Sequence, residues 1–451
     1  MPSEKPHAVL RELAEPSVYA RELKALVTRH AQPGRRPWAQ GDLLLGDWDP
    51  GLCAEVAKEL ARVVPRGDYR FGISTGQLAV IGGKERTLYR ASISDAAVAA
   101  VLARLLRTLS EPALSTRVYS YRPGRSSVQA VRDFSAFVRG HRQAEPDPRR
   151  RGFYVLRRDV ARYGESIPVA ESSALWPMLA ELWHASGIAS SHPLVQLTEQ
   201  AIRPRISTGN GSARQLERGV PTGSPIQPVI CNLYLSRLDR SLENLDGGFY
   251  ARYGDDILFA HPNPDLFQQA SLRIERDLSE LGLTLKAEKV VNYYFTGCGR
   301  SAKAARGTTS VEYLGLRVAF TGAVGLPTNK ARRLLRRLLR RAGNAAALSN
   351  SEGVSLSREA VCCAVQAALD SRLSVAEPLA ALLKHAVDDR SQLRHLDYLI
   401  ALGIARRLAR KRGVRAFRTV PYASLRRAGL PSLTAHRNFR REKDADDGGS
   451  D

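Results

Sequence analysis

Strand-like alternation of apolar and polar residues marks three parts of the chain. They are Tyr69–Arg90, Gly152–Val160 and Phe249–Ala260. The first contains a turn signal at Gly82-Gly83, and Gly254-Asp255-Asp256 interrupts the third, so these two parts predict β-hairpins. The second is a single β-rich run that ends near Asp159.

Helical periodicity, with apolar residues three or four positions apart, covers much of the remainder. The predicted helices are Leu10–Val27, Ala54–Val64, Ser94–Leu109, Leu175–Ser186, Val229–Leu242, Asp265–Gly282 and Asn329–Arg341. Segments rich in glycine and basic residues predict loops at Arg203–Gly219 and Thr296–Thr308. No internal repeat is visible.

The chain is strongly basic, because 68 Lys and Arg residues against 45 Asp and Glu residues give a net charge of +23. Such an excess suits a nucleic-acid partner, and an anionic membrane surface is the weaker alternative. No segment has the length and apolarity of a membrane span. The five cysteines form no C-x-x-C pair, so neither a zinc ribbon nor a disulfide framework is expected, and we expect a cytoplasmic protein.

The predicted helix Asn329–Arg341 concentrates this charge, since it has seven basic residues and no acid. Its leucines form an apolar stripe, and its other faces are cationic. A solvated arginine face would explain this pattern, but repulsion among so many like charges favours a track that binds phosphates. A second basic cluster lies at Arg406–Arg418, and Lys443–Asp451 has the composition of a disordered acidic tail.

Adjacent acids at the turn of the predicted hairpin Phe249–Ala260 indicate chemistry. Asp255 and Asp256 are costly between buried strands unless a cation neutralises them. A type I′ turn also favours Asp and Gly, and this is the structural alternative. Asp159 follows another strand, so two strand ends can present carboxylates to a pair of Mg²⁺ ions.

Several motifs in order strengthen this interpretation. They are Arg122-Pro123-Gly124-Arg125-Ser126-Ser127, Asp159, Gly219–Pro228 followed by Asn232-Leu233-Tyr234-Leu235, Tyr253-Gly254-Asp255-Asp256, Gly282–Leu285 with Glu288-Lys289, and Tyr313-Leu314-Gly315. In this order the chain resembles prokaryotic reverse transcriptases related to group II intron-encoded enzymes, over roughly Lys84–Phe320. Any one of these motifs is weak, but their order makes coincidence an inadequate explanation.

The resemblance implies an α+β, right-hand polymerase fold with fingers, a palm that has an antiparallel sheet, a helical thumb, and helical extensions at both ends. The expected divisions are 1–65 for the N-terminal extension, 66–325 for fingers and palm, 326–442 for the basic thumb and C-terminal region, and 443–451 for a disordered tail.

The resemblance also implies roles for individual residues. The expected catalytic residues are Asp159, Asp255, Asp256 and Lys289, with the lysine as general acid toward pyrophosphate. The expected ligands of two Mg²⁺ ions, or of Mn²⁺, are Asp159, Val160, Asp255 and Asp256. Nucleotide contacts are expected from Arg86, Arg90, Tyr163, Gly164, Gly223 and Ser224. Nucleic-acid contacts are expected from Arg122, Arg125, Tyr313, Leu314, Gly315, Lys330, Arg333, Arg336, Arg337 and Arg340. For Arg86 and Arg90, an ordinary position on a surface strand is almost as well supported.

Two motifs depart from the family pattern. Thr222 and Gln227 stand where Gln and Ser are usual, and Gly164 stands where an aromatic residue normally blocks a ribose 2′-hydroxyl. Either Tyr163 takes that role through a shifted backbone, or selection between deoxyribose and ribose is relaxed.

The segment Asp159–Pro168 resembles the "unknown group" of bacterial enzymes, many of them linked to anti-phage defence. The expected function is therefore an RNA-directed DNA polymerase that uses an RNA template, a nucleic-acid primer and dNTPs. A dedicated non-coding RNA or a partner protein is a candidate partner of the C-terminal helices, and an extended thumb is the alternative for them. An RNA-templated RNA polymerase, and an RNA-binding maturase or scaffold with a palm fold, remain open as other functions.

Overall fold

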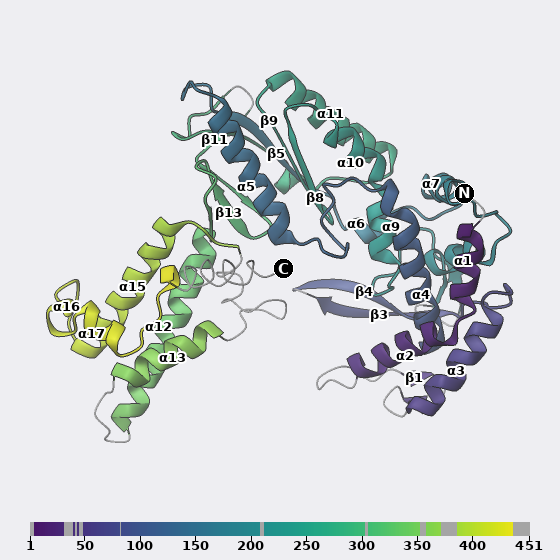
Figure 1. The fold of residues 1–451 in the computed structure, drawn as a ribbon, viewed down its shortest axis with the longest axis horizontal. Coiled ribbons are helices and arrows are strands. Elements are labelled where there is room, and N and C mark those ends of the chain that lie inside the picture. The colour runs from purple at the N-terminus through teal and green to yellow at the C-terminus, as the bar shows by residue number, and fades with distance from the viewer. Residues whose placement is uncertain are drawn as a thin grey trace, which may run out of the picture. The chain divides into compact units, whose positions relative to one another are not determined.

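The structure, a computed structural model, describes residues 4–30, 39–40, 43–44, 48–81, 83–207, 212–302, 305–351, 358–370 and 386–435 (Figure 1). The chain divides into two compact units. Unit 1 comprises residues 1–126 and 154–292, and unit 2 comprises residues 127–153 and 293–451. Over the described ranges, no helix combines the length and apolarity that crossing a membrane requires. The predicted acidic tail lies outside them.

Helices form the first part of unit 1. They are α1 (Glu4–Leu13), α2 (Pro16–His30), α3 (Pro50–Val63) and α4 (Ile93–Ser110), with the short strands β1 (Ala39–Gln40) and β2 (Leu43–Leu44) and the 3-10 helix η2 (Glu111–Ala113). The Ser92 side chain caps α4 by accepting a hydrogen bond from the Asp95 amide. Most of the Ala, Val and Leu residues of α4 are buried, so this helix forms the centre of the helical layer.

A four-stranded sheet follows, in the order β4-β3-β6-β7. Its strands are β3 (Ser74–Ile81), β4 (Lys84–Arg90), β6 (Arg205–Ser207) and β7 (Arg214–Gln215). The antiparallel pairing of β3 and β4 runs from Thr75 opposite Arg90 to Ile81 opposite Lys84. The first predicted hairpin is therefore confirmed, although Gly82 lies outside the described residues.

The acids lie on a second group of strands, made of β5 (Phe153–Asp159), β8 (Phe249–Tyr253) and β9 (Asp256–His261). Strand β9 lies between the other two and is antiparallel to both. Their apolar side chains are almost entirely buried, which explains the strand-like runs in the sequence. The register places Asp159 opposite Asp256, so both strands bring an acid to the same end of the sheet.

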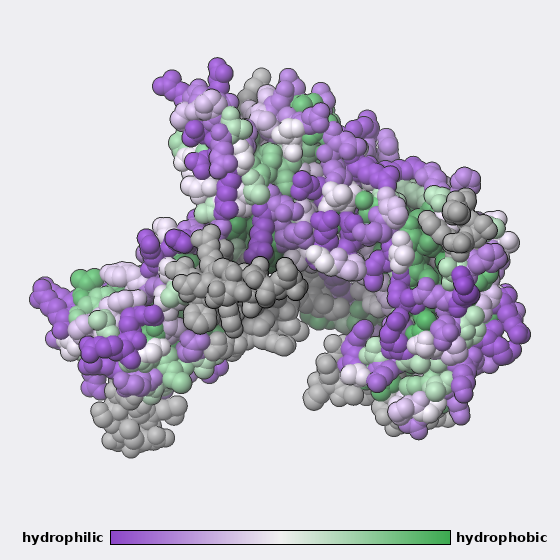
Figure 2. Space-filling view, in the orientation of Figure 1, coloured by the Kyte–Doolittle hydropathy of each residue, from purple (hydrophilic) through white to green (hydrophobic). Residues whose placement is uncertain are grey.

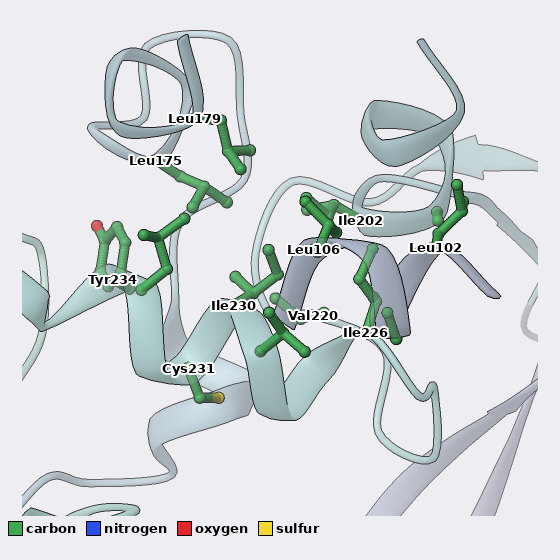
Figure 3. Packing of buried hydrophobic residues seen from close by; sticks show 14 of the residues in the cluster. Leu102, Leu106, Leu175, Leu179, Ile202, Val220, Ile226, Ile230, Cys231 and Tyr234 are labelled. Atoms are coloured by element: carbon green, nitrogen blue, oxygen red, sulfur yellow. The ribbon is translucent and has the colours of Figure 1, made fainter. Parts of the chain in front are cut away.

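Further helices of unit 1 pack on these strands or on other helices. They are α6 (Tyr163–Ser166), α7 (Leu175–Ala185), α8 (Pro193–Ile202), α9 (Gln227–Tyr234), α10 (Ser236–Glu243), α11 (Pro264–Glu280) and the 3-10 helix η3 (Ala287–Lys289). Figure 3 shows Ile230 and Tyr234 of α9 in one apolar cluster with Leu175 of α7 and Leu106 of α4. This cluster fixes α9 from several sides, and α9 begins at the cleft described below.

Helix α11 is amphipathic. Phe267, Ala270, Ile274 and Leu278 are buried at spacings of three or four residues. Asn263 caps its N-terminus by accepting hydrogen bonds from two backbone amides. In the space-filling view, hydrophilic residues cover the outer surface over α10 and α11 (Figure 2). The helix thus closes one side of the core and leaves a polar surface.

Unit 2 combines helices with small sheets. Its helices are α5 (Ser127–Ala144), α12 (Thr328–Ser351), α13 (Arg358–Asp370), α15 (Arg390–Ala409), α16 (Ala416–Thr419) and α17 (Tyr422–Arg427). Its strands include β10 (Val291–Phe295), which begins at the boundary, β11 (Arg306–Thr308), β12 (Ser310–Tyr313), β13 (Leu316–Ala319) and β14 (Val324–Gly325). A cluster of aromatic rings contains Phe134, Phe153, Phe295 and Phe320.

These elements confirm the expected α+β class and correct several details. The predicted helix Val229–Leu242 is two helices, because Leu235 leaves the α conformation at φ −101° and ψ 7°. Leu10–Val27 is also broken, and Pro16 begins a new helix there, as a residue without an amide hydrogen does readily. The two predicted loops contain the short strands β6, β7 and β11. The two compact units place α5 with the C-terminal residues, and the expected domain limits stay a prediction.

Candidate active site

The turn between β8 and β9 holds the two adjacent acids. Tyr253 pairs with Asp256, which leaves Gly254 and Asp255 as a two-residue turn. Gly254 has φ +65°, whereas Asp255 is not among the residues with positive φ. This is the arrangement of a type II′ turn, which requires a glycine at its first central position, rather than of the type I′ turn considered from the sequence. Gly254 is therefore required by backbone geometry.

Backbone contacts hold this turn on both sides. The Gly254 amide donates to the Ser120 hydroxyl over 2.8 Å, and the Val160 amide donates to the Asp255 carbonyl over 3.0 Å. Val160 follows directly after Asp159 in the chain. The bond from Val160 consequently connects the turn with the strand end that carries the third acid.

A lysine links the carboxylates of Asp159 and Asp255. The Lys286 ammonium contacts the Asp159 carboxylate closely and lies 3.3 Å from the Asp255 carboxylate, and the Lys289 ammonium contacts Asp159 as well. Only 6% of the Asp159 side chain is exposed, against 45% for Asp255. Two carboxylates from different strands therefore meet at one cation position, and one of them remains open to solvent.

The pKa shifts follow from these contacts. Burial by itself would raise the pKa of Asp159, but hydrogen bonds from Lys286 and Lys289 outweigh it and hold that pKa below its usual value. Burial would lower the pKa of Lys286, and the bond to Asp159 together with the charge of Asp255 raises it instead. Asp159 is thus ionised and Lys286 is charged at neutral pH.

Asp256 has a different environment from the other two acids. Its carboxylate lies 2.8 Å from the Arg157 guanidinium, and its Oδ1 atom is buried without a hydrogen-bond partner. Burial raises the pKa of Asp256, and Arg157 opposes this shift. The structure pairs Asp256 with an arginine, so its expected role as a metal ligand stays a prediction.

The donor set nevertheless fits a divalent cation. Ionised carboxylate oxygens are the ligands that Mg²⁺ prefers. An ammonium group already lies between Asp159 and Asp255, which shows that this position accepts positive charge. Within the described residues, no group of three or more His, Cys, Asp and Glu side chains is arranged to hold a metal ion. The fit therefore rests on the carboxylate pair, which leaves coordination positions for water and a phosphate.

A buried ion pair stabilises the turn between β8 and β9. Arg252 and Asp239 form a bidentate pair with both distances 2.7 Å, and neither side chain is exposed. Arg252 also donates to the carbonyls of Gly254 and Asn232, and the Tyr250 hydroxyl donates to Asp239 over 2.5 Å. The carboxylate raises the pKa of Arg252, although burial opposes this. Sequence reasoning missed this pair, whose one signal was an arginine within an apolar strand.

Asp255 opens onto a cleft of about 560 Å³. Its lining residues come from several elements of unit 1: Leu78, Glu85, Arg86, Thr87, Tyr121, Arg162, Tyr163, Gly164, Glu165, Gln227, Pro228, Cys231, Gly254, Asp255 and Lys286. Of the residues predicted to contact a nucleotide, Arg86, Tyr163 and Gly164 are in this lining, whereas Arg90, Gly223 and Ser224 are not. The cleft thus combines two arginines with carboxylates and a lysine.

Tyr163 is buried, although it belongs to the lining of the cleft. Arg162 has φ +46°, and the next residue turns its ring into the core, where the Tyr163 hydroxyl donates to the Cys231 carbonyl over 2.5 Å. The side chain above Gly164 is that of Gln227, because a Cβ atom on Gly164 would lie 2.5 Å from the Gln227 Nε2 atom. Gln227 is held there by donating to the Val220 carbonyl over 3.0 Å. The two departures from the family pattern are therefore neighbours in space.

Arg122 and Arg125 lie in the loop before α5. Only 7% of the Arg122 side chain is exposed, and its guanidinium donates to the carbonyls of Ser115 and Val118 and pairs with Glu111. This is the environment of a residue that anchors a loop, and the expected contact of Arg122 with nucleic acid stays a prediction. Arg125 stacks over the Tyr119 ring at 5.8 Å.

The remaining predicted nucleic-acid contacts lie in unit 2. Tyr313 is buried and pairs with Leu316, which leaves Leu314 and Gly315 as a turn in which both residues have positive φ. The Lys330 ammonium donates to the Gly315 carbonyl over 2.7 Å.

Along α12, Leu334 and Leu338 are buried. Arg333, Arg336 and Arg340 are exposed, and Arg337 is half-buried. The predicted apolar stripe and cationic face of this helix are confirmed.

Comparisons with known proteins bear on this site. The family described as "Reverse transcriptase (RNA-dependent DNA polymerase)" matches residues 82–318. An uncharacterised 91 kDa protein in the cob intron of Schizosaccharomyces pombe is 25% identical over 202 residues, which are 44% of this chain and 22% of that protein. This chain therefore spans about a fifth of that relative's length.

Solved structures give more distant likenesses. Apo telomerase from Candida tropicalis has a TM-score of 0.45 at 11% identity, over 82% of this chain and 63% of that one. Telomerase from Candida albicans, in complex with a fragment of telomeric RNA, has a TM-score of 0.42 at 14% identity, over 81% and 62% of the two chains. The chain spans less than two thirds of both proteins.

Proposed function

The chain belongs to the reverse transcriptase (RNA-dependent DNA polymerase) family, and we propose that it extends a nucleic-acid primer by copying an RNA template. The observation that carries this proposal is the meeting of Asp159 and Asp255 at one cation position beside a cleft that also contains Arg86. Phosphoryl transfer needs little more from a protein than positioning and positive charge near the phosphates. This site supplies both.

We propose that Asp159 and Asp255 hold Mg²⁺, with Asp256 and the Val160 backbone as supporting ligands. When bound, two such ions would lower the pKa of a primer 3′-hydroxyl and neutralise the departing pyrophosphate. Asp159 is suited to this task because its pKa is low, so it binds a cation without first losing a proton. Asp255 is suited because it is half exposed and reachable from the cleft.

The cationic side chains of the site would serve the triphosphate. Arg86 lines the cleft and can pair with phosphate oxygens. Lys286 and Lys289 now neutralise Asp159 and would be released toward a bound nucleotide once another cation replaces them. Lys289 remains the candidate that protonates pyrophosphate, and Lys286 is a second candidate because it reaches both carboxylates.

A primer-extension assay tests the function. Purified protein would be given an annealed RNA template and primer, Mg²⁺ and dNTPs, and the products would be resolved by length. We expect extension by the unaltered protein and its loss in Asp255→Asn. Glu280→Gln, an exposed acid at the end of α11, is the matched control and should extend normally. Full activity in Asp255→Asn would overturn the proposal.

Synthesis of RNA on an RNA template is the second candidate, and one observation favours it. Gly164 has no side chain, and Tyr163 is turned into the core, so neither presents an aromatic ring to the sugar. The same assay with rNTPs in place of dNTPs separates the two candidates, because extension with rNTPs alone would replace the first proposal by the second.

A role in anti-phage defence extends the proposal from the enzyme to the cell. The support for it is the resemblance of Asp159–Pro168 to the "unknown group" enzymes. Cells that carry the gene should survive phage challenge better than cells that carry Asp255→Asn. Equal survival, with both proteins present in equal amounts, would remove defence from the proposal and leave polymerisation untouched.

A further inference from the structure

Unit 2 contains a cavity of about 600 Å³ whose lining is unusually basic. Among the described residues that line it are five arginines and no carboxylate. The arginines are Arg142, Arg149, Arg151, Arg300 and Arg317. The cavity is separate from the carboxylates of the polymerase site, which belong to unit 1.

Neutral groups hold several of these guanidiniums in place. Arg300 donates to the Arg149 carbonyl over 2.7 Å, and Arg151 donates to the Glu145 carbonyl over 2.8 Å. Arg142 lies over the Phe320 ring, 5.3 Å from its centroid. Carbonyls and aromatic faces position a guanidinium without cancelling its charge. The arginines are therefore pre-organised and remain cationic.

Carboxylates neutralise little of this charge. Arg317 pairs with Asp389 over 2.6 Å. In the part of the chain that the structure describes, no carboxylate forms an ion pair with the other four arginines, and the nearby Asp147 pairs instead with Arg150. The Nε atoms of Arg142 and Arg317 are buried and have no hydrogen-bond partner. About four positive charges thus share one cavity, with donors still free.

A thiol in the same cavity lies among hydrogen-bond donors. Cys298 is exposed and lines the cavity. A hydrogen bond from the Arg300 backbone, and a second from the Thr296 hydroxyl, lower the pKa of this thiol. Donors that stabilise a thiolate also stabilise other anions at the same place.

We propose that this cavity binds a polyphosphate chain, as carried by a nucleoside triphosphate or by inorganic tripolyphosphate. A triphosphate carries roughly four negative charges near neutral pH, since the second ionisation of a phosphate has a pKa of about 6. This number matches the four arginines that have no carboxylate partner. In nucleic acid each phosphodiester carries one charge and a sugar separates it from the next, whereas a triphosphate concentrates its charges on adjacent phosphates. The volume of the cavity also lies in the usual range for small ligands, about 300–1,000 Å³.

Protection of Cys298 from alkylation tests the proposal. The full chain, in EDTA so that no metal-dependent binding contributes, would be treated with iodoacetamide over a series of tripolyphosphate concentrations. Peptide mapping would give the rate at each cysteine. Cys363 is also exposed and does not line the cavity, so it is an internal control. We expect slower alkylation of Cys298 alone, and equal rates with and without tripolyphosphate would overturn the proposal.

Charge variants show where the ligand binds. Arg149→Gln with Arg300→Gln should raise the half-protecting concentration roughly tenfold or more, because two charge-assisted bonds are lost. Arg306→Gln with Arg358→Gln removes the same total charge outside the lining and should leave that concentration unchanged. Comparing each variant with and without ligand corrects for any change in the reactivity of the thiol itself.

Two further arms identify the ligand. Stronger protection by ATP than by tripolyphosphate would assign a nucleoside triphosphate, and equal protection would assign the phosphate chain alone; both outcomes support the proposal. If Arg86→Gln removes protection while the Arg149 and Arg300 variant keeps it, the ligand binds at the cleft and the proposal is wrong. Stronger protection by an RNA oligonucleotide at equal phosphate concentration would also overturn it. None of these outcomes depends on polymerase activity.

Discussion

The contact between Gly164 and Gln227 leads to a prediction that can be measured as a coupling energy. In Gly164→Ala the new Cβ atom would lie 2.5 Å from Gln227 Nε2 and 3.1 Å from Gln227 Cδ, so the amide must move. Moving it breaks the hydrogen bond to the Val220 carbonyl, which contributes about 1 kcal/mol. An off-rotamer side chain adds roughly 0.5–1.5 kcal/mol.

The lower conformational entropy of the unfolded alanine variant offsets part of this loss of stability. Gly164 lies in α6 at a negative φ, so alanine is compatible with the backbone there. The loss of freedom in the unfolded chain then favours alanine by about 0.4–1 kcal/mol. We therefore expect Gly164→Ala to lower the free energy of unfolding of unit 1 by about 1 kcal/mol.

A double-variant cycle isolates the contact. Gln227→Ser removes the amide, so Gly164→Ala should be neutral or stabilising when it is made in that background. The coupling energy between the two sites should be about 1–2 kcal/mol, within the range for residues in contact. Urea denaturation of the four proteins, followed by a probe in unit 1, provides the measurement. Effects that add to within about 0.5 kcal/mol would refute the geometry.

We expect the same pair to influence the choice between ribose and deoxyribose. Gly164→Phe should be tolerated only together with Gln227→Ser, and this double variant should use rNTPs much less than dNTPs. Relative incorporation of the two nucleotide types in the primer-extension assay measures the effect. Equal loss of both in the double variant would mean that the new ring blocks the cleft rather than reading the 2′-hydroxyl.

Three more outcomes follow from other contacts. Arg252→Met leaves the Asp239 carboxylate buried without its partner, so the free energy of unfolding should fall by roughly 3–5 kcal/mol in a denaturant titration, and a fall under 1 kcal/mol would contradict a fully buried pair. Lys286→Met removes the ammonium that now binds both site carboxylates, so Mn²⁺ should raise the unfolding temperature at a lower concentration than in the unaltered protein; an unchanged concentration would show that the lysine does not compete. Replacing Arg336 and Arg340 by Gln should weaken binding to any RNA sequence and reduce the slope of log affinity against log salt by about 2, and an unchanged slope would make that face merely solvated.

The parts of the fold that the sequence predicted well are those with strong local patterns. The hairpin of β8 and β9 combines apolar strands with a turn that only glycine adopts easily, so it could be located to the residue. The short strands β6 and β7 could not, because two or three residues show no periodicity and their pairing depends on distant β3. The break at Leu235 was also hidden, since the apolar pattern continues through it.

The residues of the candidate site also differ in whether a local sequence pattern reveals them. The acids were predicted because each stands at the end of an apolar strand, where a charge is conspicuous. Lys286 was not, because a lysine in a polar stretch gives no signal until β5 and the turn bring Asp159 and Asp255 to it. Gln227 was noticed as a departure from the family pattern, but only the folded chain shows that it fills the space above Gly164.

The Arg252–Asp239 pair also limits how this chain can change over time. A single replacement that removes either charge leaves the other one buried and unpaired, and the same arginine holds the carbonyl of Gly254. A different solution to the same packing problem therefore requires two or more substitutions at once. Random drift should leave both residues fixed while the surface around them diverges, and laboratory evolution of this polymerase should exempt these two codons from mutagenesis or randomise them jointly.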